Sequence, residues 1–183
     1  MRTTDRRAVT APAAPADVPA RWSDVPPSPS DRRARRLAGQ VHDGQMDRLG
    51  GHMLDHVLRV AASVPPAART VALVHDVCER DGGTPDQVAV RLHLTAEERE
   101  ALVLLTKTTG ERLLDHTRRV IAAPAGPARD LALVVKRADI DDHRARAAAP
   151  DPSYDEVREL VRGALSATTA AGPGLPDGVA AAR

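Results

Sequence analysis

A short apolar stretch, RTVALVHDVCER (69–80), carries a histidine and an aspartate side by side. On a helix, His75, Asp76 and Glu79 share one face, because side chains three and four positions apart lie above one another. Apolar residues fill the other faces, and an ionised aspartate is unfavourable in a buried helix unless it is paired or bound to a metal. The pair therefore predicts either a hydrogen bond within the core or a share in a metal site.

Two other apolar helical patterns carry matching groups, since His56 lies in GGHMLDHVLRVAASV and Asp139 lies in ALVVKRADIDDH. Together with His75 and Asp76 they offer two imidazoles and two carboxylates. Such a mixed set suits one borderline or hard divalent ion and leaves positions open for water and substrate. The spacing alone does not decide between this site and a metal-free pair in the core.

The composition predicts one domain with an aliphatic core. The chain has 183 residues with no Phe, one Trp and one Tyr, so Leu, Val, Ala and Ile must fill the core. We expect this domain at 30–169, between tails at 1–29 and 170–183 that are rich in Pro, Ala and Gly and should be disordered.

The composition also limits the partners. So few aromatic rings disfavour recognition of bases by stacking, and a formal net charge of +1 indicates no strongly charged partner, so we expect no nucleic acid. The single cysteine, Cys78, fits a reducing compartment, and the chain shows neither a secretory signal nor an apolar run that could span a bilayer. We therefore expect a cytoplasmic protein without a membrane partner, and the composition leaves its oligomeric state open.

Caps and breakers divide the domain into helices. They predict helices that begin near residues 31, 52, 67, 85, 96, 111, 128 and 154, and the third runs to Glu79. The expected N-caps are Ser30, Thr84, Thr95 and Ser153, of which the last two head capping boxes. Because no stretch alternates as a strand does, we expect an all-α bundle of about seven or eight helices.

Four stretches, in this order, resemble a known family. HDGQMDRLGGHMLDHVLRVA, ALVHDVCE, LLTKTTGE and VVKRADIDDH, between residues 37 and 143, resemble the motifs of HD-domain phosphohydrolases. The nearest branch is the small relatives of the (p)ppGpp hydrolase domain of RelA/SpoT enzymes. The resemblance implies an all-α domain that holds one divalent ion, often Mn²⁺, and hydrolyses a phosphate or pyrophosphate bond in a nucleotide such as (p)ppGpp.

The resemblance also implies roles for single residues. Catalysis would depend on Asp76 and on Glu79, which would position or deprotonate the attacking water. The metal ligands would be His56, His75, Asp76 and Asp139. The candidate contacts of the substrate are Arg48, Arg80, Lys107, Lys136 and His143. In the same comparison His42 and Gln45 match a structural element, and His93 and His116, which match no motif, are expected on the surface.

The chain departs from the family pattern near the expected site. Gly51 and Met53 stand where the alarmone hydrolases have an acid and an aromatic residue. Arg80 replaces a second acid, and His143 stands where the family usually has Asn. Metal binding can outlast the original specificity, so the main alternative is a degenerate HD domain that binds a nucleotide or a protein without turnover.

Two further alternatives come from short patterns. Two capped helices within 84–105 resemble a helix-turn-helix, but the second opens with carboxylates that would repel DNA phosphates. The segment HMLDH, between His52 and His56, distantly resembles a zinc-peptidase motif in which Asp55 takes the place of Glu.

Overall fold

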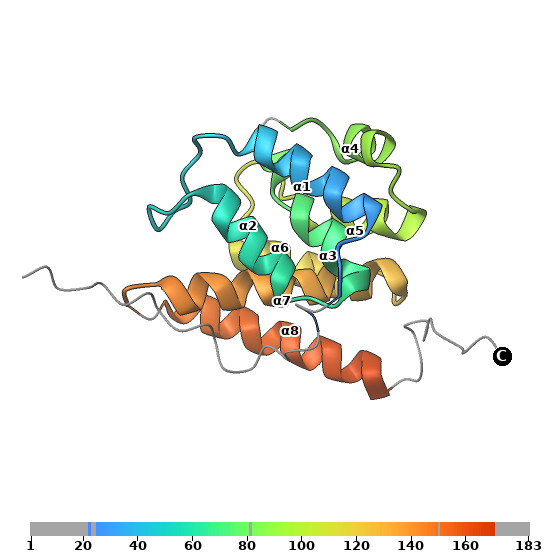
Figure 1. The fold of residues 1–183 in the computed structure, drawn as a ribbon. Coiled ribbons are helices and arrows are strands. Elements are labelled where there is room, and N and C mark those ends of the chain that lie inside the picture. Colours follow the sequence, from blue (N-terminus) through green and yellow to red (C-terminus); the bar gives the residue numbers. More distant parts are fainter. Residues whose placement is uncertain (1–21, 23–24, 81, 150, 171–183) are drawn as a thin grey trace, which may run out of the picture.

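The structure, a computed structural model, describes residues 22, 25–80, 82–149 and 151–170, so most of both expected tails lies outside the described residues. Within them the predicted all-α fold is confirmed, with eight α-helices, one short 3₁₀ helix and no strand (Figure 1). The helices are α1 (Pro29–Val41), α2 (Met53–Ala62), α3 (Pro66–Val74), α4 (Pro85–Leu92), α5 (Ala96–Leu105), α6 (Leu113–Ala122), α7 (Pro127–Arg146) and α8 (Pro152–Ala170), and the 3₁₀ helix is η1 (Val77–Glu79).

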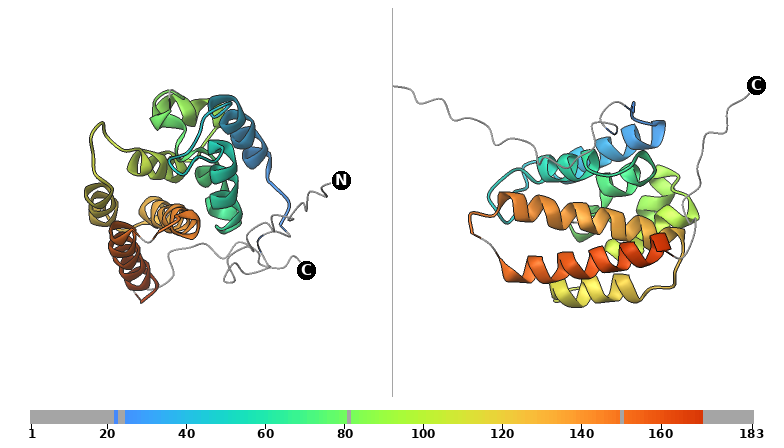
Figure 2. Two further views of the ribbon diagram at one scale, coloured as in Figure 1. Left: turned by 90° about the vertical axis from the view of Figure 1, so that its left-hand side faces the viewer. Right: turned by 90° about the horizontal axis from the view of Figure 1, so that it is seen from below.

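Helix α7 is the centre of the bundle. It packs against α2, α3, α5, α6 and α8, and the end-on view in Figure 2 shows these neighbours around it. Its buried apolar residues include Ala132, Leu133, Val135 and Ile140, which join the main core. Because α2 and α3 both contact α7, polar side chains from these three helices can meet although they are far apart in the sequence.

Two of the predicted helix starts are confirmed by their capping bonds. Thr84 and Gln87 exchange side-chain and backbone hydrogen bonds at the start of α4. Thr95 and Glu98 do the same at the start of α5. Each capping box satisfies backbone N–H groups that the first helical turn leaves without partners.

Two other predicted caps are wrong. The cap of α1 is Ser28, whose hydroxyl accepts from the Asp31 N–H at 3.0 Å, and not Ser30. Pro29 follows it at the first helical position, where the missing N–H of proline loses no bond. At α8, the Asp151 carboxylate accepts from the backbone N–H of Ser153 at 2.9 Å, so Ser153 lies inside the helix and caps nothing.

The largest difference from the predicted helices concerns the histidine–aspartate pair. The expected helix 67–79 stops at Val74, and the chain continues through a turn into η1. His75 is the C-cap residue of α3, and Asp76 directly precedes η1. The two side chains therefore lie on a tight turn, and the helical face expected to carry both residues and Glu79 does not exist.

Backbone hydrogen bonds hold the turn that follows α3. Glu79 N donates to Asp76 O at 3.2 Å, and the Gly82 N–H turns back to Val77 O at 2.9 Å. Bonds between residues three apart tighten the chain into a 3₁₀ turn. A Cβ at position 82 would collide with Val77, so only glycine permits this reversal.

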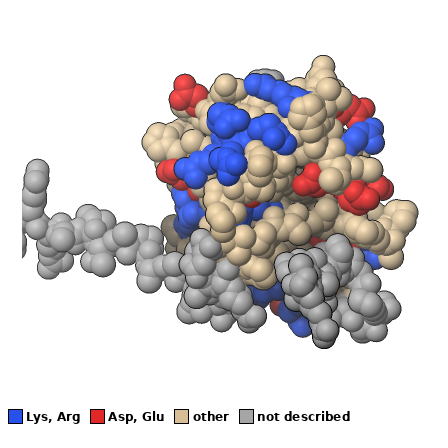
Figure 3. Space-filling model, turned by 45° about the vertical axis from the view of Figure 1, so that its right-hand side comes forward, with Lys and Arg blue, Asp and Glu red and all other residues tan. Residues whose placement is uncertain are grey.

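The surface carries charges of both signs. On the face drawn in Figure 3, Lys and Arg side chains gather over the upper part, and Asp and Glu lie mainly to the right. None of the helices in the described part of the chain combines the length and the apolar character needed to cross a membrane.

Candidate metal centre

Side chains from α2, from the turn after α3 and from α7 converge on one point. The His56 Nε2 atom, from α2, lies 3.8 Å from Asp76 Oδ2 and 3.5 Å from Asp139 Oδ1. The His75 Nε2 atom, from the turn after α3, lies 3.6 Å and 4.0 Å from the same two oxygens. The structure thus brings together all four residues that the sequence suggests as metal ligands.

Each of the two histidines has one ring nitrogen held and one open. His56 Nδ1 lies 2.8 Å from Asp142 Oδ2, and His75 Nδ1 donates to the Ala72 carbonyl oxygen at 2.8 Å. Both Nε2 atoms are buried and hydrogen-bond to no described group. Because a bond at Nδ1 orients the ring and selects its tautomer, Nε2 is the atom presented to a ligand.

Asp139 uses its two oxygens differently. Oδ2 accepts from Lys136 Nζ at 3.1 Å, whereas Oδ1 faces His56 and His143. Burial raises the pKa of Asp139, but Lys136 and the nearby imidazoles of His143 and His56 outweigh burial and hold the pKa well below its usual range. Asp139 is therefore an anion at neutral pH, with one oxygen directed at the cluster.

The carboxylates also act on His56, whose side chain is fully buried. Burial alone lowers the pKa of this imidazole, but the carboxylates of Asp139, Asp142 and Asp76 outweigh it and raise the pKa to about 10. In the absence of a cation, the cluster therefore retains a proton on His56. A divalent cation supplies the same compensating charge and competes with that proton for the ring.

The donor set and its spacing fit one divalent ion. Ligand atoms of His56, His75 and Asp76 lie within 4.8 Å of one another, and so do those of His56, Asp139 and His143. Two atoms bound to one ion at about 2.1 Å lie about 3.0 to 3.4 Å apart. The distances from Asp139 Oδ1 to His143 and His56, 3.3 and 3.5 Å, need little change to reach that range.

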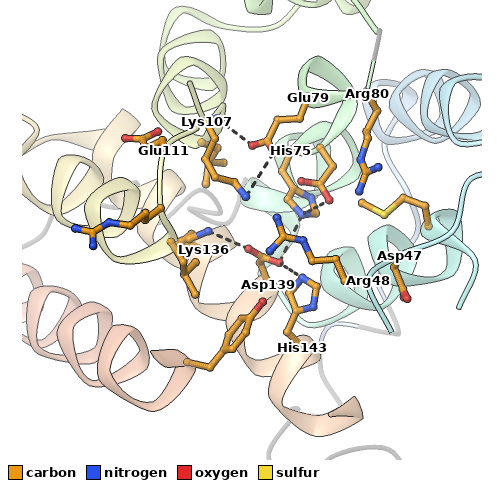
Figure 4. Close-up of a pocket in the computed structure, with 16 residues that line it drawn as sticks. Asp47, Arg48, His75, Glu79, Arg80, Lys107, Glu111, Lys136, Asp139 and His143 are labelled. Atoms are coloured by element: carbon orange, nitrogen blue, oxygen red, sulfur yellow. Dashed lines mark hydrogen bonds and ion pairs between the residues drawn. The ribbon is translucent and has the colours of Figure 1, made fainter. Parts of the chain in front are cut away.

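A pocket opens beside these ligands, as Figure 4 shows. Glu79, which sequence analysis suggests as the proton acceptor, lines it and accepts from the Lys107 backbone N–H at 2.9 Å. Its other carboxylate oxygen lies 3.5 Å from Lys107 Nζ. The five suggested substrate contacts also line this pocket: Arg48, Arg80, Lys107, Lys136 and His143.

Two arginines differ from the other basic side chains of the pocket. The side chains of Arg48 and Arg80 make no hydrogen bond or ion pair with any described residue, whereas the side chains of Lys107 and Lys136 are paired with carboxylates. In Figure 4 both arginine side chains extend towards the space beside His75. A guanidinium group without a carboxylate partner can hold an anion through two parallel hydrogen bonds.

The structure shows which residues surround Gly51 and Met53, the two positions that differ from the motif of the HD-domain family. Asp47 pairs with Arg146 beside Gly51, and a side chain at position 51 would collide with the guanidinium group. Met53 is buried and lines the pocket. The Asp47–Arg146 ion pair therefore occupies the place next to the pocket that a larger residue at 51 would need.

Sequence analysis missed Asp142. This carboxylate accepts from Arg59 at 2.6 and 3.0 Å as well as contacting His56. Burial raises the pKa of Asp142, but His56 and Arg59 outweigh it and lower the pKa to about 2. The available signal was its spacing, because Asp142 follows Asp139 by three positions and therefore shares its side of α7.

The expected surface position of His116 is wrong, whereas His93 is exposed as predicted. The His116 side chain is 1% exposed, and its Nε2 donates to the Leu104 carbonyl oxygen at 3.0 Å. Burial and the nearby Lys136 lower its pKa to about 4. The apolar period of α6, in which His116 precedes Val120 by one turn, was the overlooked signal.

Next to His116, Arg119 ties the loop before α6 to the helix. It pairs with both carboxylate oxygens of Glu111, at 2.8 and 2.9 Å, and donates to the carbonyl oxygens of Leu104 and Thr106. Arg119 lowers the pKa of Glu111 to about 2. The charged groups of Arg119 and Glu111 therefore pair with each other.

Other histidines stay apart from the ligand cluster. His42 is buried, its Nδ1 lies 3.1 Å from Gln45 Oε1, and it belongs to neither ligand group. His52 is exposed at the N-cap of α2, and Asp55 is also exposed. The HMLDH segment therefore does not assemble the centre that the peptidase alternative needs.

No protein-family model matches the chain, and no curated protein matches it either. The residues of the centre and of the pocket therefore carry the evidence for a function.

Proposed function

We propose that this chain is a metal-dependent phosphohydrolase of the HD-domain type that acts on a phosphate or pyrophosphate bond of a nucleotide. One observation carries the proposal: two buried imidazoles with open Nε2 atoms meet two carboxylates beside a pocket lined by basic side chains. Phosphate esters need both kinds of group, because the reaction requires an activated water and compensation of negative charge.

His56, His75, Asp76 and Asp139 would hold the cation, which is Mn²⁺ by the family resemblance. When bound, such an ion lowers the pKa of a coordinated water and offsets charge on a phosphate. Glu79 would accept a proton from the water, because its carboxylate lines the same pocket and the Lys107 backbone holds it in place.

The basic side chains of the pocket would bind the substrate. Arg48 and Arg80 have no carboxylate partner among the described residues and would hold phosphate oxygens directly. Lys107 and Lys136 add positive charge beside the carboxylates that they contact. Several phosphate groups could share this lining, which favours a nucleotide related to (p)ppGpp. The same lining also suits the alternative, a domain that binds a nucleotide without hydrolysing it.

The test combines metal analysis with an assay of phosphate and pyrophosphate release from a nucleotide panel that includes (p)ppGpp. We expect about one divalent ion per chain. We also expect a melting temperature that falls with chelator and rises with Mn²⁺, because a ligand of the native state stabilises it. Asp55→Asn is the matched control for Asp76→Asn, since Asp55 is exposed on α2.

Two outcomes would change the proposal. A melting temperature indifferent to both chelator and Mn²⁺ would contradict the metal centre. A protein that binds the ion and a nucleotide but releases nothing from the whole panel would favour the non-catalytic alternative.

A further inference from the structure

His143, which the family resemblance suggests as a substrate contact, lies as close to Asp139 as the suggested metal ligands do. Its Nε2 atom is 3.3 Å from Asp139 Oδ1, whereas the Nε2 atoms of His56 and His75 lie 3.5 and 4.0 Å from the same oxygen. His143 follows Asp139 by one turn of α7, so both side chains project from the same face. Three imidazole nitrogens are therefore directed at one carboxylate oxygen.

His143 and His56 also share a group of atoms small enough to surround an ion. With Asp139 their ligand atoms lie within 4.8 Å of one another, and the two ring centroids are 4.7 Å apart. His56 belongs to the group with His75 and Asp76 as well. Because Asp142 holds His56 Nδ1 at 2.8 Å, only Nε2 can serve both groups, and they therefore describe one centre.

We propose that His143 is a fifth ligand of this centre and determines its selectivity among divalent ions. The inference rests on the proposed metal-dependent function, and it assigns His143 the role of a metal ligand instead of a substrate contact. A third imidazole should favour Co²⁺ and Zn²⁺ relative to Mn²⁺, because imidazole suits the former ions and carboxylate and water suit the latter. The Tyr154 ring packs beside the imidazole, with its centroid 5.5 Å from that of His143.

The competing arrangement is a His143 whose Nε2–H only donates a hydrogen bond to Asp139. The two arrangements differ in the number of imidazoles bound to the ion. X-ray absorption of the Zn²⁺-loaded wild type should count three imidazoles, and His143→Asn should count two. A count of two in the wild type would overturn the inference even if the variant failed to fold.

Affinities provide the second readout. Dissociation constants of Zn²⁺, Co²⁺ and Mn²⁺ are measured by chelator competition in the wild type, His143→Asn and His143→Gln. Both variants should weaken Zn²⁺ and Co²⁺ by about 10- to 100-fold, the loss usual even for an outer partner of a metal ligand, and weaken Mn²⁺ less. His93→Asn is the matched control, because His93 is exposed and its φ of 56° is readily adopted by Asn.

The outcomes separate this inference from the proposed function. If both variants fold when chelated and keep all three affinities, His143 is not a ligand, and the metal-dependent function stands. An equal loss for the three ions would overturn the selectivity. If the wild type binds none of the ions, the proposed function is wrong as well. The melting temperature should then respond neither to chelator nor to Mn²⁺.

Discussion

His56 and His116 are both buried histidines on helices that pack against α7, yet their surroundings give them opposite properties. Carboxylates around His56 outweigh its burial and raise its pKa to about 10, whereas burial and Lys136 lower the pKa of His116 to about 4. Lys136 acts on both sides, because its ammonium group pairs with Asp139 on the side of His56 and its charge lowers the pKa of His116. Burial alone therefore does not decide what a histidine does, and the charges that face its ring do.

The same contrast applies to the arginines of the two regions. Arg119, beside His116, pairs with Glu111 and donates to two carbonyl oxygens. The guanidinium group of Arg80, on the side of His56, makes no hydrogen bond or ion pair with a described residue. We interpret the first region as one that stabilises the fold and the second as one that binds ligands.

The largest expected effect is the loss of metal from the His56 region. Asp76→Asn and His75→Ala should each abolish metal occupancy and phosphohydrolase activity, because each removes a ligand from the centre. Metal content after gel filtration and product release measure the two effects. His116→Leu should keep the metal, although His116 is equally buried. An occupied Asp76→Asn site, or an empty His116→Leu site, would break the comparison.

The next effect separates the ligands from the proton acceptor. Glu79→Gln should keep the metal and lower the rate by about 100-fold or more, as expected for loss of a general base. Turnover and metal content are measured on the same sample. Glu97→Gln, an exposed carboxylate at the start of α5, is the matched control. If Glu79→Gln emptied the site as Asp76→Asn should, Glu79 would be a ligand.

The third effect is a pH dependence of stability caused by His116. Its pKa of about 4 in the folded chain lies below the 6.5 of an ordinary histidine, so folding opposes its protonation. Its contribution to stability is therefore complete above about pH 6.5 and is lost as pH falls towards 4, by about 3 kcal/mol in total. Urea unfolding of chelated protein between pH 7 and 4 should show a weaker pH dependence in His116→Leu, and equal slopes would contradict the assignment.

The smallest effects compare the two arginines. Arg80→Ala should raise the Michaelis constant for the true substrate by about tenfold, the loss of one charge-assisted contact, and leave the melting temperature unchanged. Arg119→Ala should leave the Michaelis constant unchanged and lower the melting temperature. It leaves Glu111 unpaired and should lower the unfolding free energy by about 2 kcal/mol. Steady-state kinetics and thermal unfolding of both variants are the measurements. Unaltered kinetic constants in Arg80→Ala would show that Arg80 does not touch the substrate.

Much of the fold was predictable because its signals are local. The capping boxes at Thr84 and Thr95 join groups only three residues apart, so their sequence contains the whole interaction. The end of α3 was not predictable in this way. Apolar residues continue past Val74, and the turn depends on backbone bonds and on the close approach of Gly82 to Val77.

The sequence by itself determined which chemical groups this protein can bring to a site and that the fold is helical. Only the tertiary structure decided their partners, because packing of α2 and α6 against α7 sets distances between residues far apart in the chain. Asp142 orients His56 across 86 positions, and Lys136 pairs with Asp139 while its charge lowers the pKa of His116. Electrostatic interactions depend on distance and burial, and neither quantity is contained in the spacing of residues along the chain.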